Sequence, residues 1–249
     1  MIKILKENEK IDDLQIKNLK IIQNKDGFCF GIDSVLLSEF AKDIRKNSSV
    51  IDFGTGTGII GFLLLAKTNI NKVVGIEVQP EVVDMVNRSI QLNGLEDKFE
   101  IINCNIKDVL SYVGRESFDT VVMNPPYKKI NTGGKNDNEK KLISRHEVLA
   151  DIYDFIKSAK YVLKDKGSLY MVHRPERLSD IIYGLKLNNI EPKKIRFVFS
   201  KENSNEAKLV LIKGIKNGGS FLQVEKPLYI YDENGKYTDE VLKIYKENK

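Results

Sequence analysis

The stretch Val121-Val-Met-Asn-Pro-Pro-Tyr127 decides how the rest of the chain is interpreted. Its first half is short, apolar and rich in β-branched residues, which predicts a buried strand. The prolines end this strand, because proline cannot donate to a sheet ladder and holds the residue before it extended. We therefore expect Asn124 and Pro125 at the carboxyl end of a strand, where open α/β sheets bind their ligands.

This turn offers the groups that could hold a planar heteroaromatic ring with an exocyclic amine. The Asn124 side-chain carbonyl and the Pro125 backbone carbonyl can accept both amine hydrogens, and the Tyr127 ring can stack on the heterocycle. A surface loop or a short polyproline ligand explains Pro-Pro-Tyr equally well when the motif is taken alone. The rest of the chain has to separate these interpretations.

Length and composition favour a soluble globular protein. The chain has 249 residues, of which 41% are hydrophobic and 30% charged, as expected for one large α/β domain or a domain with a small appendage. It has no membrane-length apolar run and no secretion signal, so we expect a cytoplasmic protein. The isolated Cys29 and Cys104, with only 2 histidines, argue against a disulfide framework and a metal site. A net charge of +5 is compatible with a polyanionic partner without requiring one.

A glycine-rich turn follows the strand predicted at Ser49 to Phe53 and precedes an apolar helix predicted at Ile59 to Lys67. Glycines at this place let backbone N–H groups approach a ligand closely. The literal match of Gly56, Gly58 and Gly61 to the dinucleotide fingerprint is discounted, because Gly61 falls inside the helix. The residues predicted to bind a cofactor here are Asp52, Gly54, Thr55, Gly56 and Gly58.

A second strand, Lys72 to Glu77, ends in a carboxylate 19 residues beyond Gly58. Such a carboxylate can accept hydrogen bonds from both ribose hydroxyls, as in dinucleotide folds. An acidic flank for the helix predicted at Pro80 to Leu92 is the alternative. The repeated strand–helix unit and the spacing of the acid favour a nucleoside-containing cofactor, held by Glu77 and Val78.

Further cofactor contacts are expected after the third strand and before the first helix. Asn105 and Ile106 follow the strand Phe99 to Asn103, where we expect the amide at the edge of a base and the isoleucine on its face. Asp108 is expected to cap a short helix to Val113. Near the N-terminus, a hairpin of Ile21 to Gln23 with Phe28 to Asp33 should feed a helix from Ser34 to Ile44. In that hairpin Phe28, Phe30 and Asp33 would fold over the ligand, or Asp33 would simply be the N-cap.

The remaining segments are predicted from periodicity and breaks. Residues 1–20 form a weakly patterned extension, and 128–146 form a polar loop that is either a substrate lid or solvated and disordered. A helix should run from Arg145 to Leu163, followed by a strand from Ser168 to Val172. The later elements are a helix from Pro175 to Leu187, antiparallel strands at Glu191 to Phe199 and Ala207 to Lys213, an apolar segment at Leu228 to Tyr231, and a helix from Thr238 to Lys246.

These motifs together resemble the class I amino-methyltransferases, which methylate exocyclic or amide nitrogens with S-adenosylmethionine. The resemblance rests on Asp52-x-Gly-x-Gly-x-Gly58, on Glu77 and on Asn124-Pro-Pro-Tyr127. With Phe28-Cys-Phe-Gly-Ile-Asp-Ser-Val-Leu-Leu37 and His173-Arg-Pro-Glu-Arg-Leu178, the chain looks like one bacterial group. That group methylates the exocyclic amine of the adenine beside the anticodon of a valine tRNA. One departure is Asn105, where many relatives carry Asp.

The resemblance implies an α/β fold with a Rossmann-like, doubly wound sheet that is mostly parallel with an antiparallel last strand. It implies a methyltransferase domain at 31–216, an N-terminal extension with a cofactor-capping hairpin at 1–30, and a packed C-terminal appendage at 217–249. The cofactor would be S-adenosylmethionine, with S-adenosylhomocysteine as product, and the partner an RNA such as tRNA. No metal and no membrane are expected, and a monomer is favoured.

The resemblance also assigns roles to the residues around the motif. Asn124, Pro125 and Tyr127 would be catalytic, with Asn124 also touching the cofactor. The residues expected to bind substrate are Pro126, Tyr127, Lys128, Arg145, His173, Arg174 and Arg177.

Other functions remain open from the sequence. A glutamine amide of a release factor or a guanine amine of ribosomal RNA presents the same pair of N–H groups to Asn-Pro-Pro-Tyr. A non-catalytic nucleoside-binding module on the same fold is a further alternative. A hydride-transferring dehydrogenase is disfavoured by the proline turn and by the placement of the glycines.

Overall fold

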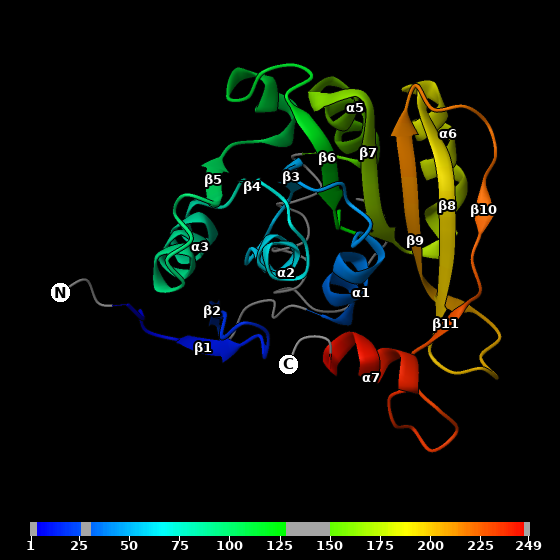
Figure 1. The fold of residues 1–249 in the computed structure, drawn as a ribbon, viewed down its shortest axis with the longest axis horizontal. Helices are drawn as coiled ribbons and strands as arrows, with labels where there is room; N and C mark the ends of the chain where they lie inside the picture. The colour runs from blue at the N-terminus through cyan, green and yellow to red at the C-terminus, as the bar shows by residue number, and fades with distance from the viewer. Residues whose placement is uncertain (1–3, 26–30, 128–149, 247–249) are drawn as a thin grey trace, which may run out of the picture.

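One open sheet organises the computed structural model, which describes residues 4–25, 31–127 and 150–246 (Figure 1). Its strands are β3 (Ser49–Phe53), β4 (Lys72–Glu77), β5 (Phe99–Asn103), β6 (Phe118–Met123), β7 (Leu163–His173), β8 (Ile190–Phe199), β9 (Ala207–Lys216), β10 (Gln223–Val224) and β11 (Leu228–Tyr229). The order across the sheet is β10-β8-β9-β7-β6-β3-β4-β5, and β11 also pairs with β8.

The sheet is mostly parallel, as predicted. Strands β5, β4, β3, β6 and β7 are parallel neighbours, and β9 lies antiparallel between β7 and β8. Parallel neighbours need crossover connections, which the intervening helices supply. Because β3 lies between β4 and β6, the segments that follow these three strands open at one edge of the sheet. This arrangement confirms the expected Rossmann-like α/β fold.

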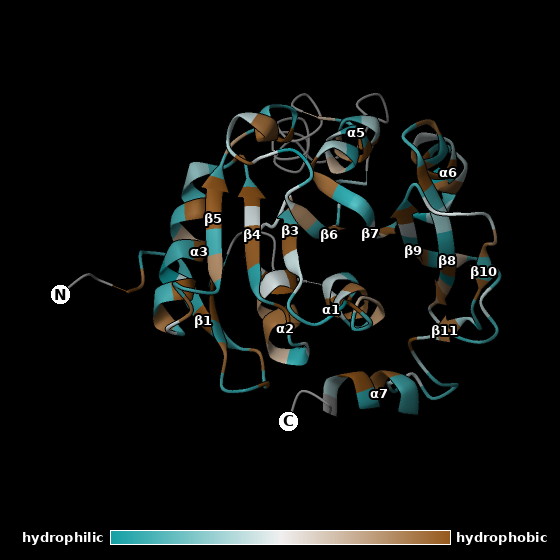
Figure 2. Ribbon diagram, turned by 45° about the horizontal axis from the view of Figure 1, so that its top comes forward, coloured by the Kyte–Doolittle hydropathy of each residue, from teal (hydrophilic) through white to brown (hydrophobic). Residues whose placement is uncertain are grey.

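Helices cover both faces of the sheet. One apolar cluster contains side chains of α1 (Ile32–Phe40), α2 (Ile59–Lys67), α3 (Pro80–Leu92) and α7 (Asp239–Lys246). The other contains side chains of the 3-10 helix η1 (Ile106–Ser111), α5 (Ile152–Val162) and α6 (Leu178–Leu187). Neighbouring residues of β3 alternate between them, as the period of a strand requires: Val50 enters the first cluster and Ile51 the second. Figure 2 shows that β4 and β5 are hydrophobic along much of their length.

The N-terminal segment has more structure than its sequence indicated. Strands β1 (Glu9–Asp13) and β2 (Lys20–Asn24) form an antiparallel pair that was not predicted from the sequence. Of the segment predicted to pair with residues 21–23, Phe28 to Phe30 lie outside the described residues, and Asp33 belongs to a helix. The pair is fastened to α3, because Ile22 N–H donates to Ser89 Oγ at 2.9 Å and Arg88 binds both carboxylate oxygens of Glu9 at 2.7 Å. This buried, bidentate ion pair ties the hairpin to α3.

Several predicted helix starts need correction. Helix α1 begins after Gly31, which has no side-chain cap, so Asp33 lies inside the first turn and is not the N-cap. Helix α5 begins at Ile152 rather than near Arg145, because Asp151 and Asp154 form a reciprocal capping box there. Asn105, not Asp108, caps η1, since its Oδ1 accepts the Lys107 N–H at 3.0 Å.

The later elements agree better with the prediction. Strand β7 is longer than expected and continues through Gly167, whose added Cβ would lie 2.9 Å from the Lys164 carbonyl oxygen. A 3-10 turn η2 (Pro175–Arg177) leads into α6. The paired β8 and β9 and the C-terminal α7 lie where they were predicted. Within the ranges that the structure describes, no helix has the length and apolar character needed to cross a bilayer.

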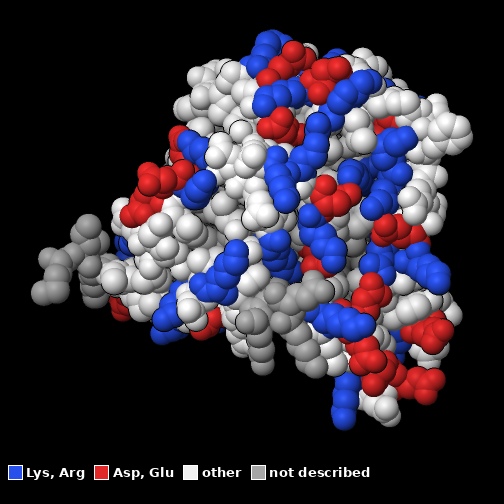
Figure 3. Space-filling model, viewed as in Figure 1, with Lys and Arg blue, Asp and Glu red and all other residues white. Residues whose placement is uncertain are grey.

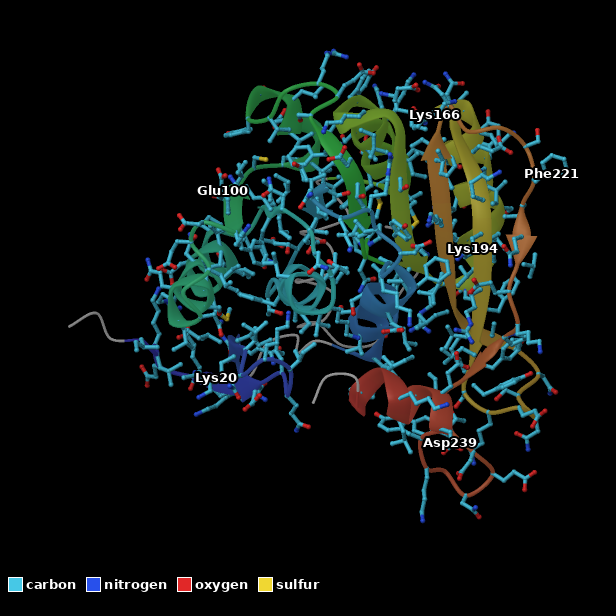
Figure 4. All side chains as sticks on the ribbon, viewed as in Figure 1. Lys20, Glu100, Lys166, Lys194, Phe221 and Asp239 are labelled. Carbon is cyan, nitrogen blue, oxygen red and sulfur yellow. The ribbon has the colours of Figure 1, made fainter. Side chains whose placement is uncertain are left out.

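Basic and acidic side chains intermingle on the face of β8 and β9 beside α1 (Figure 3). Lys213 Nζ lies 2.6 Å from Asp43 Oδ2, and Tyr170 OH donates to Asp43 Oδ1 at 2.7 Å. Lys194, labelled in Figure 4, lies 3.1 Å from a carboxylate oxygen of Glu225. Because these lysines face carboxylates, this face is closer to neutral than the net charge of +5 suggests.

Candidate functional site

The glycine turn between β3 and α2 depends on backbone conformations that side chains disfavour. Gly54, Gly56 and Gly58 have φ angles of 69°, 54° and 79°, in the left-handed region that glycine adopts without steric cost. A Cβ at Gly56 would meet nothing within 4 Å, whereas one at Gly61 would lie 2.5 Å from Phe99 Cζ. Gly56 therefore leaves its backbone open to a ligand, while Gly61 lets α2 pack on β5.

Asp52 lies immediately before this turn and is fully buried. Its Oδ2 accepts a hydrogen bond from Thr55 Oγ1 at 2.6 Å, and its Oδ1 has no partner among the described residues. Burial raises the pKa of Asp52 to about 7; the hydrogen bond from Thr55 opposes this shift and the charge of Glu77 adds to it. A buried, half-satisfied carboxyl group at a sheet edge is suited to a positively charged or hydroxyl donor of a ligand.

Glu77 holds the neighbouring loops together through both carboxylate oxygens. Its Oε2 accepts the Gly56 N–H at 3.1 Å, and its Oε1 accepts the N–H groups of Val78 and Gln79 at 2.9 and 3.0 Å. A carboxylate offers about four acceptor sites, so a ribose would have to share or replace these donors. The geometry of Glu77 is therefore compatible with both interpretations made from the sequence. Glu77 flanks the start of α3, and it lies at the edge of the sheet where a ribose would bind.

The end of β5 is tied to the end of β4. Asn103 Nδ2 and Cys104 N–H both donate to the Glu77 carbonyl oxygen, at 2.8 and 3.1 Å. Sequence reasoning missed Asn103, because nothing in a strand-terminal asparagine signals such a bond. Next along the chain, Asn105 is engaged as the cap of η1, and Ile106 is buried.

The Asn-Pro-Pro-Tyr turn that follows β6 contains one buried hydrogen-bond acceptor. Asn124 Oδ1 is buried and has no hydrogen-bond partner in the parts of the chain that are described. Pro125 is buried and Pro126 exposed. Tyr127 donates its hydroxyl proton to Asp33 Oδ2 at 2.6 Å. Burial, followed by the charge and hydrogen bond of Asp33, raises the pKa of Tyr127 far above its usual value, so the phenol stays neutral.

The segment after β7 packs against Tyr127. The His173 ring meets the Tyr127 ring edge-on at 5.1 Å between centroids, and Arg174 Cζ lies 5.1 Å from the Tyr127 centroid. His173 Nδ1 accepts the Arg174 N–H at 2.8 Å, which places the ring proton on Nε2. Burial lowers the pKa of His173 to about 4, so its imidazole is neutral near pH 7. Nε2 is buried without a partner in the described residues.

The structure gathers most, but not all, of the predicted site residues that it describes. Asp33, Tyr127, His173 and Arg174 form one contact cluster. Arg177 is paired with Asp180, since its Nε donates to Asp180 Oδ2 at 2.7 Å in the first turn of α6, and it acts on His173 through its charge. Phe28, Phe30, Lys128 and Arg145 lie outside the described residues. Within those residues, no group of three or more His, Cys, Asp and Glu side chains is arranged to hold a metal ion.

Comparison with known proteins identifies the family. The family described as "Methyltransferase small domain" matches residues 24–186, a span that includes the glycine turn, Glu77 and the Asn-Pro-Pro-Tyr turn. The chain belongs to this methyltransferase family.

Several similar proteins are named tRNA1(Val) (adenine(37)-N6)-methyltransferase. The protein of that name from Actinobacillus pleuropneumoniae serotype 7 is 23% identical over 231 residues, covering 92% of this chain and 94% of its own length. The one from Porphyromonas gingivalis strain W83 is 27% identical over 175 residues, covering 68% of each. A crystal structure described as a predicted O-methyltransferase from Agrobacterium tumefaciens superposes with a TM-score of 0.69. It is 20% identical and covers 87% of this chain and 96% of its own, a likeness of fold.

Proposed function

We propose that this protein transfers a methyl group from S-adenosylmethionine to the exocyclic N6 amine of an adenine in RNA, namely a tRNA adenine near the anticodon. The observation that carries the proposal is the buried, unpartnered Asn124 Oδ1. A buried acceptor without a donor costs about 1–3 kcal/mol, and an exocyclic amine supplies that donor. The tRNA names of relatives that span most of the chain support adenine in tRNA as substrate.

The residues at the sheet edge fit the cofactor. Asp52 Oδ1 is a buried acceptor suited to the cationic end of S-adenosylmethionine, and the Gly56 backbone is open to close approach. Glu77 lies at the end of β4 and would take the ribose hydroxyls. The cofactor supplies an electrophilic methyl group on a positively charged sulfur.

The reaction needs little proton chemistry from the protein. Hydrogen bonds from the adenine amine to Asn124 Oδ1 and the Pro125 carbonyl favour a pyramidal nitrogen with a localised lone pair. In-line attack by that lone pair would form the N–CH3 bond while the S–CH3 bond of the cofactor breaks, which would release S-adenosylhomocysteine. The methylated nitrogen would then lose a proton to water. Neutral His173 and neutral Tyr127 fit this scheme, because neither ionises near pH 7. Positioning can supply on the order of 7–11 kcal/mol of the barrier.

The adenine has to leave its stack before it can reach Asn124. We infer that it stacks on Tyr127, which recovers about 1–3 kcal/mol of the few kcal/mol that unstacking costs. The unit that carries this chemistry is residues 31–216, with 1–30 and 217–249 as appendages on it. We place the protein in the cytoplasm as a monomer.

The test is a labelling experiment with competing acceptors. The protein is incubated with tritiated S-adenosylmethionine and, separately, with an unmodified valine tRNA transcript, ribosomal RNA and a release factor, and the RNA is digested to nucleosides. We expect label in N6-methyladenosine from tRNA, absent when the adenine beside the anticodon is replaced by guanine. Label in protein or in methylguanosine would overturn the substrate, and cofactor binding without label anywhere would overturn the activity.

A further inference from the structure

Helix α1 is fastened at both ends by an aspartate that accepts a tyrosine hydroxyl. In its first turn Asp33 Oδ2 accepts from Tyr127 at 2.6 Å, and just beyond its last residue Asp43 Oδ1 accepts from Tyr170 at 2.7 Å. The second bond joins α1 to β7, outside the candidate site. The first joins α1 to the Asn-Pro-Pro-Tyr turn across 94 residues of sequence.

The bond between Asp33 and Tyr127 restrains the tyrosine at its tip. Hydrogen bonds from a hydroxyl to a carboxylate are short and about twice as strong as neutral ones. The ring itself packs against His173, against Arg174, whose Cζ lies 5.1 Å from the ring centroid, and against the first apolar cluster. The hydroxyl also interacts with the side chain of Asn124. The hydroxyl is therefore the directional restraint on the plane of the ring.

The hydroxyl itself has no evident chemical task. Because burial and Asp33 raise the pKa of Tyr127, the phenol does not ionise and cannot serve as a base near pH 7. The Asp33 oxygen that Tyr127 reaches is likewise engaged within the protein.

We propose that Asp33 is a positioning residue that acts through Tyr127. It holds the ring in the orientation on which the target base stacks, so its loss impairs use of the RNA and leaves cofactor affinity intact. The inference rests on the proposed function, since the stacked base belongs to the acceptor. It deepens that function by assigning α1 to acceptor recognition.

A double-mutant cycle tests this role. Asp33→Ala, Tyr127→Phe and the double variant are compared with the parent for tRNA KM, kcat and S-adenosylhomocysteine affinity by calorimetry. We expect each single change to raise the tRNA KM about tenfold, with the double variant no worse than either single one. Asp33→Asn keeps an acceptor for the tyrosine hydroxyl and should recover most of the loss. S-Adenosylhomocysteine affinity should stay within about twofold throughout.

The other end of α1 provides a matched control. Tyr170→Phe removes the same type of bond just beyond the end of α1 and leaves the ion pair of Asp43 with Lys213 in place. Neither Tyr170 nor Asp43 is among the residues assigned above to the candidate site. We expect this variant to lower the midpoint of thermal unfolding without raising the tRNA KM. A rise equal to that of Asp33→Ala would mean that loosening α1 anywhere has this effect, and would overturn the specific role of Asp33.

The outcomes separate this inference from the proposed function. Weaker S-adenosylhomocysteine binding by Asp33→Ala, or additive losses in the double variant, would overturn the positioning role even in an enzyme that methylates tRNA. If the parent labels a different acceptor, the proposed substrate fails and the same cycle is measured with that acceptor. The thermal-unfolding cycle for Asp33 and Tyr127 needs no substrate; additivity there would show that the bond does not form and would overturn the inference alone.

Discussion

Ionisation of Asp52 should control cofactor binding. The unliganded carboxyl has a pKa of about 7 because it is buried, and a bound cofactor ammonium would favour its charged form. For that pKa, about 3% is ionised at pH 5.5 and about 75% at pH 7.5, so affinity should rise roughly 25-fold over this range. In Asp52→Asn the rise should vanish and affinity at pH 7.5 should be weak.

Isothermal calorimetry with S-adenosylhomocysteine measures the change of binding affinity with pH directly. The Asp52→Asn variant supplies the baseline, because titration of the ligand amine, with a pKa near 8, affects both proteins. Equal pH dependence in parent and variant would refute the reasoning, since it would show that Asp52 does not titrate with binding.

The pH dependence of folding stability is a second test of the raised pKa of Asp52. A carboxyl whose pKa rises from 3.8 to about 7 on folding favours the folded state when protonated. That advantage is complete at pH values below the unfolded pKa and is lost as pH rises through the folded one, by roughly 4 kcal/mol at most. The free energy of unfolding of the parent should therefore fall relative to Asp52→Asn between pH 4 and 7. A constant difference, measured by urea unfolding, would contradict the raised pKa.

The remaining predictions concern single side chains. Asn124→Ala should lower kcat about 10²–10³-fold while S-adenosylhomocysteine affinity stays near that of the parent; equal losses in turnover and calorimetry would argue against its acceptor role. Glu77→Ala should weaken S-adenosylhomocysteine binding at least about tenfold, with Glu77→Gln intermediate, because both the glycine turn and the cofactor lose an acceptor; unchanged affinity would displace the ribose contact. Gly61→Ala should cost about 1–3 kcal/mol of unfolding free energy, because the new Cβ would lie 2.5 Å from Phe99 Cζ. Gly56→Ala meets no neighbour within 4 Å but places alanine at a φ of 54°, which costs about 1–2 kcal/mol. It should in addition weaken cofactor binding, which Gly61→Ala should not, and calorimetry would distinguish the two glycines.

The fold was predictable from the sequence where hydrophobic period and breaks coincide. The strands β3 to β5 and the helices α2 and α3 begin and end as predicted, because each apolar run is bounded by glycine, proline or a charged residue. Strand β6 begins earlier than the run from Val121 indicated, at Phe118. The N-terminal pair was not predictable in this way. Strand β1 reads Glu-Lys-Ile-Asp-Asp, which has a single apolar residue. It is fastened through Glu9 to Arg88 of α3, a contact between distant segments that no local pattern shows.

The sequence predicted which residues lie at the candidate site better than it predicted the hydrogen bonds between them. The glycine turn, Asp52 and Asn124 lie at the expected edge because strand order brings β3, β4 and β6 together. The hydrogen bond of Asp33 was not foreseeable, since an aspartate near a helix start is most often a cap. Its partner Tyr127 lies 94 residues away. Likewise, no local pattern shows that Glu77 accepts the N–H of Gly56.

The packing of α7 on α1 links the two ends of the chain. Val241 and Ile244 of α7 enter the same apolar cluster as Val35 and Leu37 of α1, and α1 carries Asp33 in its first turn. Because α7 lies far beyond α1 in the sequence, it emerges from the ribosome long after α1 and most of the sheet have been made. Until then the helix that restrains Tyr127 lacks part of its apolar cover. A chain truncated before α7 should therefore keep its sheet but hold Tyr127 less firmly, and methylation competence should appear only once α7 has packed on α1.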